Sequence, residues 1–277
     1  MLDALAAHWP EYLIEAILLG SFMLSACLAV VAMEHPRSPL ARAGRSPTSR
    51  RVIIAILMGL TAIALIYSPL GQRSGAHMNP GTTLTFLMLG KIKPWDTFFY
   101  IVAQFAGGLM GVAASRMALG RSLGHERVNY AATLPGKRGM GVAWAAEFAI
   151  SFAMMGMVLL STNHDRTAPY TGIFAGLLVA VFIAVEAPLS GMSMNPARTL
   201  ASALPARAFR GLWIYFTAPP LAMLSAAVLY MVTSGAEHVY CSKLNHRGHA
   251  RCIFDCRIAA MPGRPETPIA PHGIQRP

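Results

Sequence analysis

Two Asn-Pro dipeptides and one nearby arginine are the polar features of this sequence that most clearly point to a function. Asparagine caps the free N–H groups at a helix N-terminus, and proline suits the first helical turn. The amide of each asparagine also carries N–H donors that a solute with a hydrogen-bond acceptor can use. The chemistry expected here is recognition of a polar, uncharged molecule. The two motifs consist of Asn79, Pro80 and Gly81, and of Asn195, Pro196 and Ala197.

The two motifs belong to an internal repeat. Residues 74–84 read SGAHMNPGTTL and residues 190–200 read SGMSMNPARTL, with seven of eleven positions identical. A single Asn-Pro dipeptide could simply cap a helix in a loop. Two matched copies, separated by 116 positions (195 minus 79), indicate instead a duplicated functional element.

Six apolar segments surround the motifs and are long enough to position them in a membrane. A helix needs about 20 apolar residues to cross the bilayer core, and lipid forces a chain to satisfy its own backbone hydrogen bonds. Composition agrees, because only 13% of the residues are charged, against about 25% in a soluble domain. The predicted spans are about residues 12–33, 51–71, 95–119, 142–161, 170–189 and 211–233.

The stretches that begin at the motifs are too short to span. Those from Asn79 to Gly90 and from Asn195 to Pro205 make about ten residues of helix each, or about 15 Å. Each half of the chain therefore has three spans and one half-helix, so the second half enters from the opposite side. The predicted fold class is an all-α membrane protein with six transmembrane helices plus two re-entrant half-helices in an inverted repeat. Their asparagine ends should meet near the midplane.

This pattern predicts three regions. An N-terminal segment, 1–11, precedes a channel domain at 12–233, whose halves cover about 12–119 and 142–233. The Pro-rich tail, 234–277, is predicted to be disordered. Its cysteines and histidines are residue types that bind zinc, but their spacings include no C-x-x-C pair, so we predict no metal and no cofactor. These residues are His238, Cys241, His246, His249, Cys252 and Cys256.

Electrostatics suggests what the facing half-helices do. A helix N-terminus carries about half a positive charge, so two facing ends repel cations, including a hydrated proton. Arg198 follows Asn195 by three residues and adds to this positive zone. A membrane arginine is costly unless it lines a wet cavity, although one near an interface can extend its side chain to the headgroups.

These motifs make the sequence similar to the major intrinsic protein family, the aquaporins and aquaglyceroporins, over about residues 12–233. The resemblance implies six tilted helices, a pore in each subunit and a homotetramer in the lipid bilayer. One departure is Gly81, where the family usually has alanine; glycine loosens the first turn. The similarity rests on SGAHMNPG, SGMSMNPART, Gln104, Glu147-Phe-Ala-Ile-Ser-Phe152, Trp213-Ile-Tyr215 and Pro219.

The resemblance also implies a selectivity filter. Strict water channels of the family place a histidine where this sequence has Ile183, so the ring here is mostly apolar and suits a solute with some apolar surface. Glycerol channels commonly follow the arginine with Asp, and here it is Thr199. We expect a passive channel for water and/or small uncharged, glycerol-like solutes that excludes ions and protons; a strict water channel is the alternative. The filter residues are Met58 (or Gly59), Ile183, Met192 and Arg198.

Four further residues are assigned to the pore or its loops. By the resemblance, His77 lines the pore and Glu147 holds a re-entrant loop. Glu15 is the equivalent of Glu147, but it stands five residues before Gly20 where the family spacing is three, so an interfacial carboxylate is the alternative. Glu186 lies in the fifth span, where it faces the pore, forms structural hydrogen bonds or sits at the interface.

Other classes of function fit less well. An ion-coupled secondary transporter also uses inverted repeats and broken helices, and Glu186 favours it. The spans lack the paired carboxylates and nucleophile motifs of an enzyme, and the basic residues lack the pattern of a nucleic-acid site. The expected location is an integral membrane of the bacterial inner (plasma) type. Both termini in the cytoplasm, as in the family, would put 10 Lys/Arg inside and 13 outside, so charge gives no support for orientation.

Overall fold

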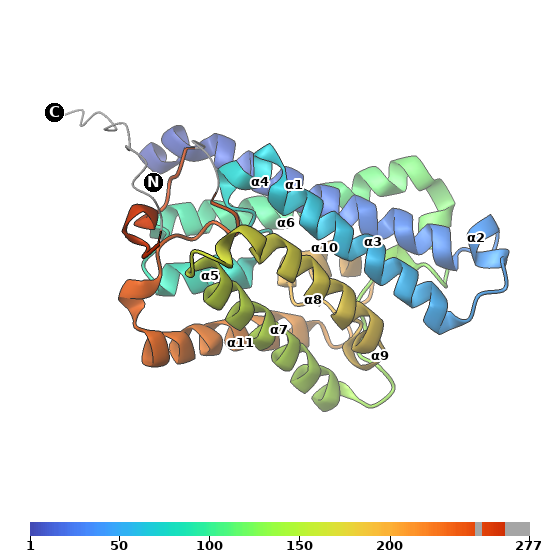
Figure 1. Cartoon of the computed structure of the whole chain (residues 1–277). Helices are drawn as coiled ribbons and strands as arrows, with labels where there is room; N and C mark the ends of the chain where they lie inside the picture. The colour runs from blue at the N-terminus through green and yellow to red at the C-terminus, as the bar shows by residue number, and fades with distance from the viewer. Residues whose placement is uncertain (247–250, 264–277) are drawn as a thin grey trace.

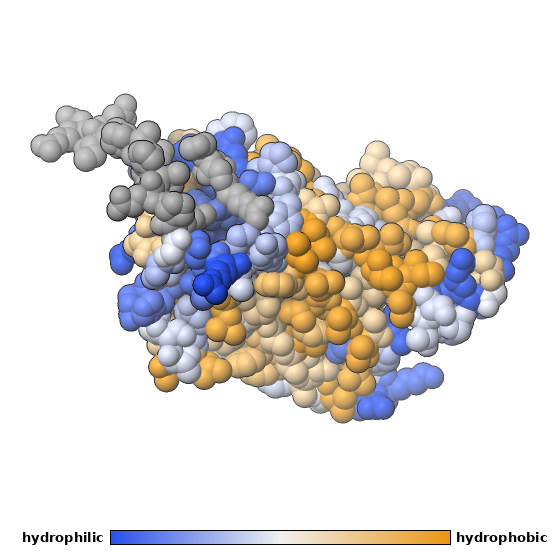
Figure 2. Space-filling view, in the orientation of Figure 1, coloured by the Kyte–Doolittle hydropathy of each residue, from blue (hydrophilic) through white to orange (hydrophobic). Residues whose placement is uncertain are grey.

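Six long helices form the body of the protein, for which a computed structural model describes residues 1–246 and 251–263. All six are long and apolar enough to cross a membrane, the fifth together with the 3₁₀ turn η3 (Ala168–Tyr170) before it. Figure 2 shows hydrophobic residues over the middle of the molecule and hydrophilic residues gathered at its two ends. The predicted all-helical membrane fold is confirmed. The helices are α1 (Leu2–Glu34), α3 (Pro47–Tyr67), α6 (Pro94–Leu119), α7 (Met140–Thr162), α8 (Thr171–Val185) and α11 (Leu212–Ser234).

Two short helices carry the Asn-Pro motifs. These half-helices are α5 (Pro80–Met88) and α10 (Pro196–Ala206). Each follows a shorter helix in the same loop, α4 (Pro69–Ser74) before α5 and α9 (Ala187–Ser190) before α10. Further short elements between the spans are α2 (Pro39–Arg42), η1 (Gly120–Gly124) and η2 (Asn129–Ala131).

The helix contacts have the symmetry of an inverted repeat (Figure 1). In the first half α1 packs against α6, and in the second α7 packs against α11. Each half-helix also packs on the last span of the other half, α5 on α11 and α10 on α6, while α3 and α8 join the halves. The two motifs are therefore held by helices from both repeats.

Glycines bring helices close together both between the halves and within the first half. A Cβ atom on Gly59 of α3 would lie 2.5 Å from the carbonyl oxygen of Gly176 of α8. Gly107 of α6 likewise lies against the backbone of Ala16 in α1, with no space for a side chain. Small residues at such crossings allow backbones to approach closely, which is how helices pack in lipid.

The two ends of the chain differ from the expected division into regions. Residues 1–11 do not form a separate segment, because α1 begins at Leu2 and continues through Pro10. Beyond α11, residues 235–246 and 251–263 fold against one end of the bundle, the end where the N-terminus also lies (Figure 1). We call these residues the C-terminal cap. It contains the 3₁₀ turns η4 (Ala236–His238) and η5 (Ile258–Ala260).

The cap is ordered by backbone hydrogen bonds, which is why it differs from the disordered tail expected from its composition. The Leu244 N–H donates to the Gly75 carbonyl oxygen at 3.1 Å, and the Asp255 N–H donates to that of Lys91 at 3.0 Å. Between Val239 and Asn245 every residue is buried. His249 and residues 264–277 lie outside the described residues.

Candidate functional site

A buried carboxylate holds the loop that leads to the first motif. One oxygen of Glu15 accepts hydrogen bonds from the Ser74 hydroxyl at 2.8 Å and the His77 N–H at 3.1 Å. Its other oxygen accepts from the Met78 N–H at 2.7 Å and from the Gln104 amide at 2.9 Å. Glu15 is fully buried, so the structure does not place it at an interface despite its unusual spacing in the sequence.

Glu147 holds the second loop in the same way. It accepts from the Ser190 hydroxyl at 2.6 Å, the Ser193 N–H at 2.7 Å and the Met194 N–H at 2.7 Å. The two carboxylates thus satisfy backbone donors that have no helical partner. Glu147 and Glu15 accept hydrogen bonds from equivalent positions of the repeat, so the two loops are held in the same way.

The loop backbones reach the motifs through left-handed residues. Gly75 and Gly191 take φ values of 94° and 86° at equivalent positions. The residues directly before the two asparagines, Met78 and Met194, also lie in this region, at 49° and 56°. Side chains other than glycine occupy it at an energetic cost, so the surrounding contacts must hold it. The conformation turns the N–H of each methionine to a glutamate while its carbonyl oxygen faces the opposite motif.

Each asparagine caps the helix that it begins. The Asn79 side-chain oxygen accepts from the Gly81 N–H at 2.9 Å. The Asn195 oxygen accepts from the Ala197 N–H at 3.0 Å and the Arg198 N–H at 3.1 Å. The amide oxygens are therefore turned toward the half-helices, and the amide nitrogens point away from them.

The amide nitrogens connect the two half-helix ends. Asn79 Nδ2 donates to the Met194 carbonyl oxygen at 2.7 Å, and Asn195 Nδ2 donates to the Met78 carbonyl oxygen at 2.6 Å. The predicted meeting of the two asparagine ends is thus realised as a reciprocal pair of bonds. Each amide has two N–H donors, so one remains for a molecule beside the motifs.

A cavity of about 460 Å³ runs beside both asparagines. Its wall includes seven of the residues singled out from the sequence, brought together from both halves of the chain. They are Met58, His77, Asn79, Ile183, Met192, Asn195 and Arg198.

The sequence motifs did not predict several other residues of the cavity wall. Met154, Met155 and Val158 come from α7, and part of the wall is the loop at 126–134. Leu244 of the C-terminal cap also lines the cavity. The loop and cap lie outside the apolar spans, so neither periodicity nor the repeat could have assigned them to the cavity.

The structure distinguishes the two candidates in the second span. Met58 is 3% exposed and lines the cavity. Gly59 instead lies at the contact between α3 and α8, against the Gly176 carbonyl. Met58 therefore lines the same cavity as Ile183, Met192 and Arg198, whereas Gly59 does not.

Arg198 is the charged residue among the four predicted filter residues. Its backbone N–H is fixed by Asn195, and its Nη1 atom has no hydrogen-bond partner among the described residues. A buried guanidinium donor at a cavity wall is costly unless a polar molecule occupies the cavity. The cavity wall thus combines a hydrogen-bond donor with apolar side chains.

His77 has a second set of partners besides the cavity. Its Nδ1 lies 3.1 Å from the Thr83 hydroxyl and its Nε2 lies 2.9 Å from the Ser242 carbonyl oxygen. The ring stacks on Phe86 and on Phe254, with centroids 5.2 Å and 5.4 Å away. His77 therefore joins the first loop to the C-terminal cap, a role for which the sequence carried no indication.

Glu186 stands apart from the predicted site. It is 6% exposed, directly after α8, and is not among the residues of the cavity wall. Neither carboxylate oxygen accepts a hydrogen bond of normal geometry within the described residues. Of the three expected placements, the structure therefore does not support the pore-facing one.

Comparison with known proteins identifies the family. Residues 6–230 match the family described as Major intrinsic protein. The chain belongs to the major intrinsic protein family. Members similar to it include Aquaporin NIP1-2 of Arabidopsis thaliana, 33% identical over 182 residues, which are 64% of this chain and 61% of that protein. Aquaporin NIP1-2 of Oryza sativa subsp. japonica is 31% identical over 224 residues, 79% of this chain and 70% of that protein.

The fold of this family member is also found among solved structures. The aquaglyceroporin from Plasmodium falciparum superposes with a TM-score of 0.69 at 16% identity, covering 83% of this chain and 99% of that one. The chain spans about 61% of the length of Aquaporin NIP1-2 of Arabidopsis thaliana. An integral membrane location follows from the family, but the plant relatives lend no support to a bacterial-type inner membrane.

Proposed function

We propose that this chain is a passive transmembrane channel for water and small uncharged, glycerol-like solutes, and that it excludes ions and protons. The observation that carries the proposal is the cavity beside Asn79 and Asn195, at the point where two half-helix N-termini face each other. Names of relatives and of the structural neighbour, aquaporin and aquaglyceroporin, agree with a channel of this kind.

Exclusion of cations is explained by the half-helices. Their N-termini place partial positive charge on both sides of the asparagine pair, and Arg198 adds a full charge nearby. The free amide N–H of each asparagine donates to a passing oxygen. A water that accepts both bonds has its own hydrogens turned outward, which interrupts a chain of waters along which protons could move.

The side chains of the proposed filter determine the range of solutes that it accepts. Met58, Ile183 and Met192 offer apolar contact but no partner that replaces the hydrogen bonds of water. Arg198 supplies hydrogen-bond donors at the wall of the same cavity. A polyol with hydroxyl groups on one side and C–H groups on the other satisfies both surfaces, so we favour such solutes over strict water selectivity.

The proposed assembly is a homotetramer in the bilayer with a pore in each subunit. The exposed faces of the spans are apolar, including Leu57 and Leu60 on α3 and Val228 and Leu229 on α11, and lipid or a neighbouring subunit would cover them. Both termini are proposed to face the cytoplasm, with the C-terminal cap on that side.

Two alternatives remain testable. A strict water channel would have the same asparagine pair but reject polyols. An ion-coupled transporter is favoured by the buried Glu186, whose carboxylate lacks a partner of normal geometry among the described residues. Its position outside the cavity wall weakens that alternative.

Stopped-flow light scattering on proteoliposomes tests the proposal. We expect fast shrinkage in an impermeant osmolyte, and faster re-swelling than protein-free vesicles in glycerol or urea, both insensitive to proton and sodium ionophores. Shrinkage without faster re-swelling would indicate a strict water channel. Ionophore-sensitive, saturable uptake abolished in Glu186→Gln would indicate the transporter.

A further inference from the structure

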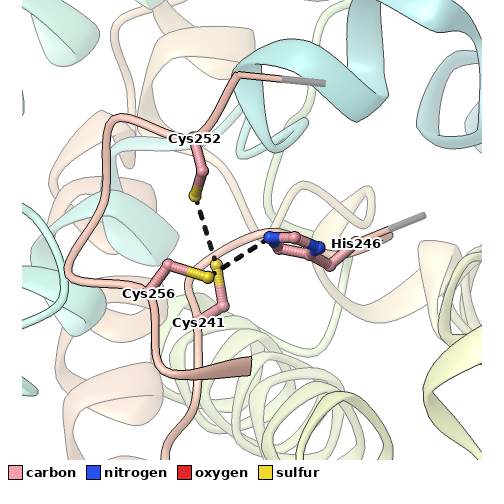
Figure 3. A group of neighbouring side chains, drawn as sticks. All are labelled: Cys241, His246, Cys252 and Cys256. Atoms are coloured by element: carbon pink, nitrogen blue, oxygen red, sulfur yellow. Dashed lines mark hydrogen bonds between the residues drawn. The ribbon is translucent and has the colours of Figure 1, made fainter. Parts of the chain in front are cut away.

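Four metal-binding side chains converge in the C-terminal cap. They are Cys241, His246, Cys252 and Cys256, and one ligand atom from each lies within 4.8 Å of all the others. Figure 3 shows the three sulfur atoms and the imidazole turned toward one another from separate stretches of the cap. In the sequence their separations are five, six and four residues, which match no standard motif, so convergence depends on the fold of the cap.

We propose that these four residues form a structural zinc site that fastens the C-terminal cap over one end of the channel. Three cysteines and one histidine are a standard donor set for a tetrahedral structural zinc ion. With Zn–S bonds of about 2.3 Å, sulfur ligands lie about 3.8 Å apart. Cys241 Sγ and Cys252 Sγ are 3.6 Å apart, and Cys256 Sγ is 3.2 Å from His246 Nε2.

The same distances argue against a disulfide. A disulfide joins sulfur atoms at about 2.0 Å, and Cys241, Cys252 and Cys256 are all free. One bond between any two would also leave the third thiol beside His246 without a function. Tetrahedral sites with sulfur and nitrogen donors favour zinc over harder cations such as magnesium or calcium.

The electrostatics of the cluster suits a metal that binds thiolates. Thiolate is the form of cysteine that binds metal, so three such ligands bring negative charge to the site. Lys243 lies between the ligands Cys241 and His246, is 2% exposed and donates from Nζ to the Arg251 carbonyl oxygen at 2.7 Å. A lysine in this place would offset part of the charge of the thiolates.

The position of the cluster explains what the ion would stabilise. The cap contains only two 3₁₀ turns within its described residues, and segments with so little regular structure often depend on a metal to fold. Between the ligands Cys241 and His246 lie Ser242, which contacts His77, and Leu244, which lines the cavity. An ion bound at Cys241 and His246 therefore holds this stretch against the first re-entrant loop.

Elemental analysis of the full-length protein tests the site. We expect protein purified in detergent, without a histidine tag, to contain about one zinc ion per chain by plasma mass spectrometry. Cys252→Ser and Cys256→Ser should lose it, whereas Cys27→Ala should keep it, because Cys27 is buried in α1. Replacement by cobalt should give the visible spectrum of a tetrahedral thiolate site.

A second measurement does not depend on the variants folding. Treating wild-type protein with a zinc chelator should accelerate tryptic cleavage in the cap, at Arg251 and Arg257, several-fold, and added zinc should reverse it. The proposal would be overturned by purified protein that contains no metal, or that contains copper or iron in place of zinc. It would also be overturned if the Cys252→Ser protein contained as much zinc as the wild type, or if a disulfide lowered the intact mass by two hydrogens. Transport measurements are not involved, so the result is independent of the proposed channel function.

Discussion

Asn79 and Asn195 each donate a side-chain hydrogen bond to the carbonyl oxygen of the residue that precedes the other, Met194 and Met78 respectively. Each amide therefore performs three tasks: its oxygen caps its own half-helix, one N–H binds the opposite loop, and one N–H is left for a solute. Because the pair is reciprocal, the two loops fix each other's position, and the donors beside the cavity are preorganised.

Removing one of these amides should weaken both the fold and the pore. Serine at position 195 can still cap α10, but it cannot reach the Met78 carbonyl oxygen. We expect Asn195→Ser to lower the free energy of unfolding by about 1–2 kcal/mol, the value of a buried hydrogen bond, and to lower water permeability. Thermal unfolding in detergent and stopped-flow scattering measure the two effects.

The equivalent change at Asn79 provides the control for reciprocity. Because the two bonds share the same pair of loops, the double variant should lose less stability than the two single losses added together. Additive losses would mean that the two bonds act independently.

The side chain at position 183 should set the balance between water and polyols. A histidine there narrows the ring and adds a donor that replaces a hydrogen bond of water. We expect Ile183→His to lower the ratio of glycerol to water permeability about tenfold, or about 1.4 kcal/mol of discrimination. Ile183→Val keeps the ring apolar and should leave the ratio nearly unchanged. If both variants behave like the parent protein, Ile183 does not contribute to the filter.

Close packing between α3 and α8 should be sensitive to a single methyl group. The Cβ atom of an alanine at 59 would lie 2.5 Å from the Gly176 carbonyl oxygen, so α3 and α8 must separate. We expect Gly59→Ala to cost about 1–3 kcal/mol of stability, measured by unfolding in detergent. Gly141→Ala is the matched control, since no atom lies within 4 Å of its added methyl group. Equal stability of the two variants would contradict the packing described here.

The C-terminal cap should modulate flow through the cavity. Leu244 contributes to the cavity wall, so its truncation widens the passage at that point. We expect Leu244→Ala to raise solute permeability about twofold. Leu229→Ala, the same truncation on an exposed face of α11, should have no effect. Unchanged permeability in Leu244→Ala would show that the cap does not limit transport.

The parts of this protein that sequence could predict are those with a strict period or a strict repeat. Six apolar runs of sufficient length can only be helices in lipid, and the duplicated motif placed Asn79 and Asn195 at equivalent points of two halves. The bonds between them could not be predicted in detail. They depend on the left-handed backbone at Met78 and Met194, which a methionine gives no reason to expect.

The cap was the hardest part to predict, for a related reason. Its sequence belongs to the tail that composition predicts to be disordered, and its order comes from tertiary bonds to distant loops, such as that between Ser242 and His77. Cys241 and Cys256 are fifteen positions apart (256 minus 241), so only the path of the intervening chain brings them together. Local composition contains no information about such a path.

The exchange of partners between the halves has a consequence for biosynthesis. The first half-helix, α5, packs against α11, which leaves the ribosome after the other five spans. Until α11 has been synthesised, α5 therefore lacks one of its native neighbours. Its short apolar surface must then be covered by the translocon or by lipid. Met223 of α11 also lines the cavity, so the wall beside the first motif is complete only after α11 has been inserted.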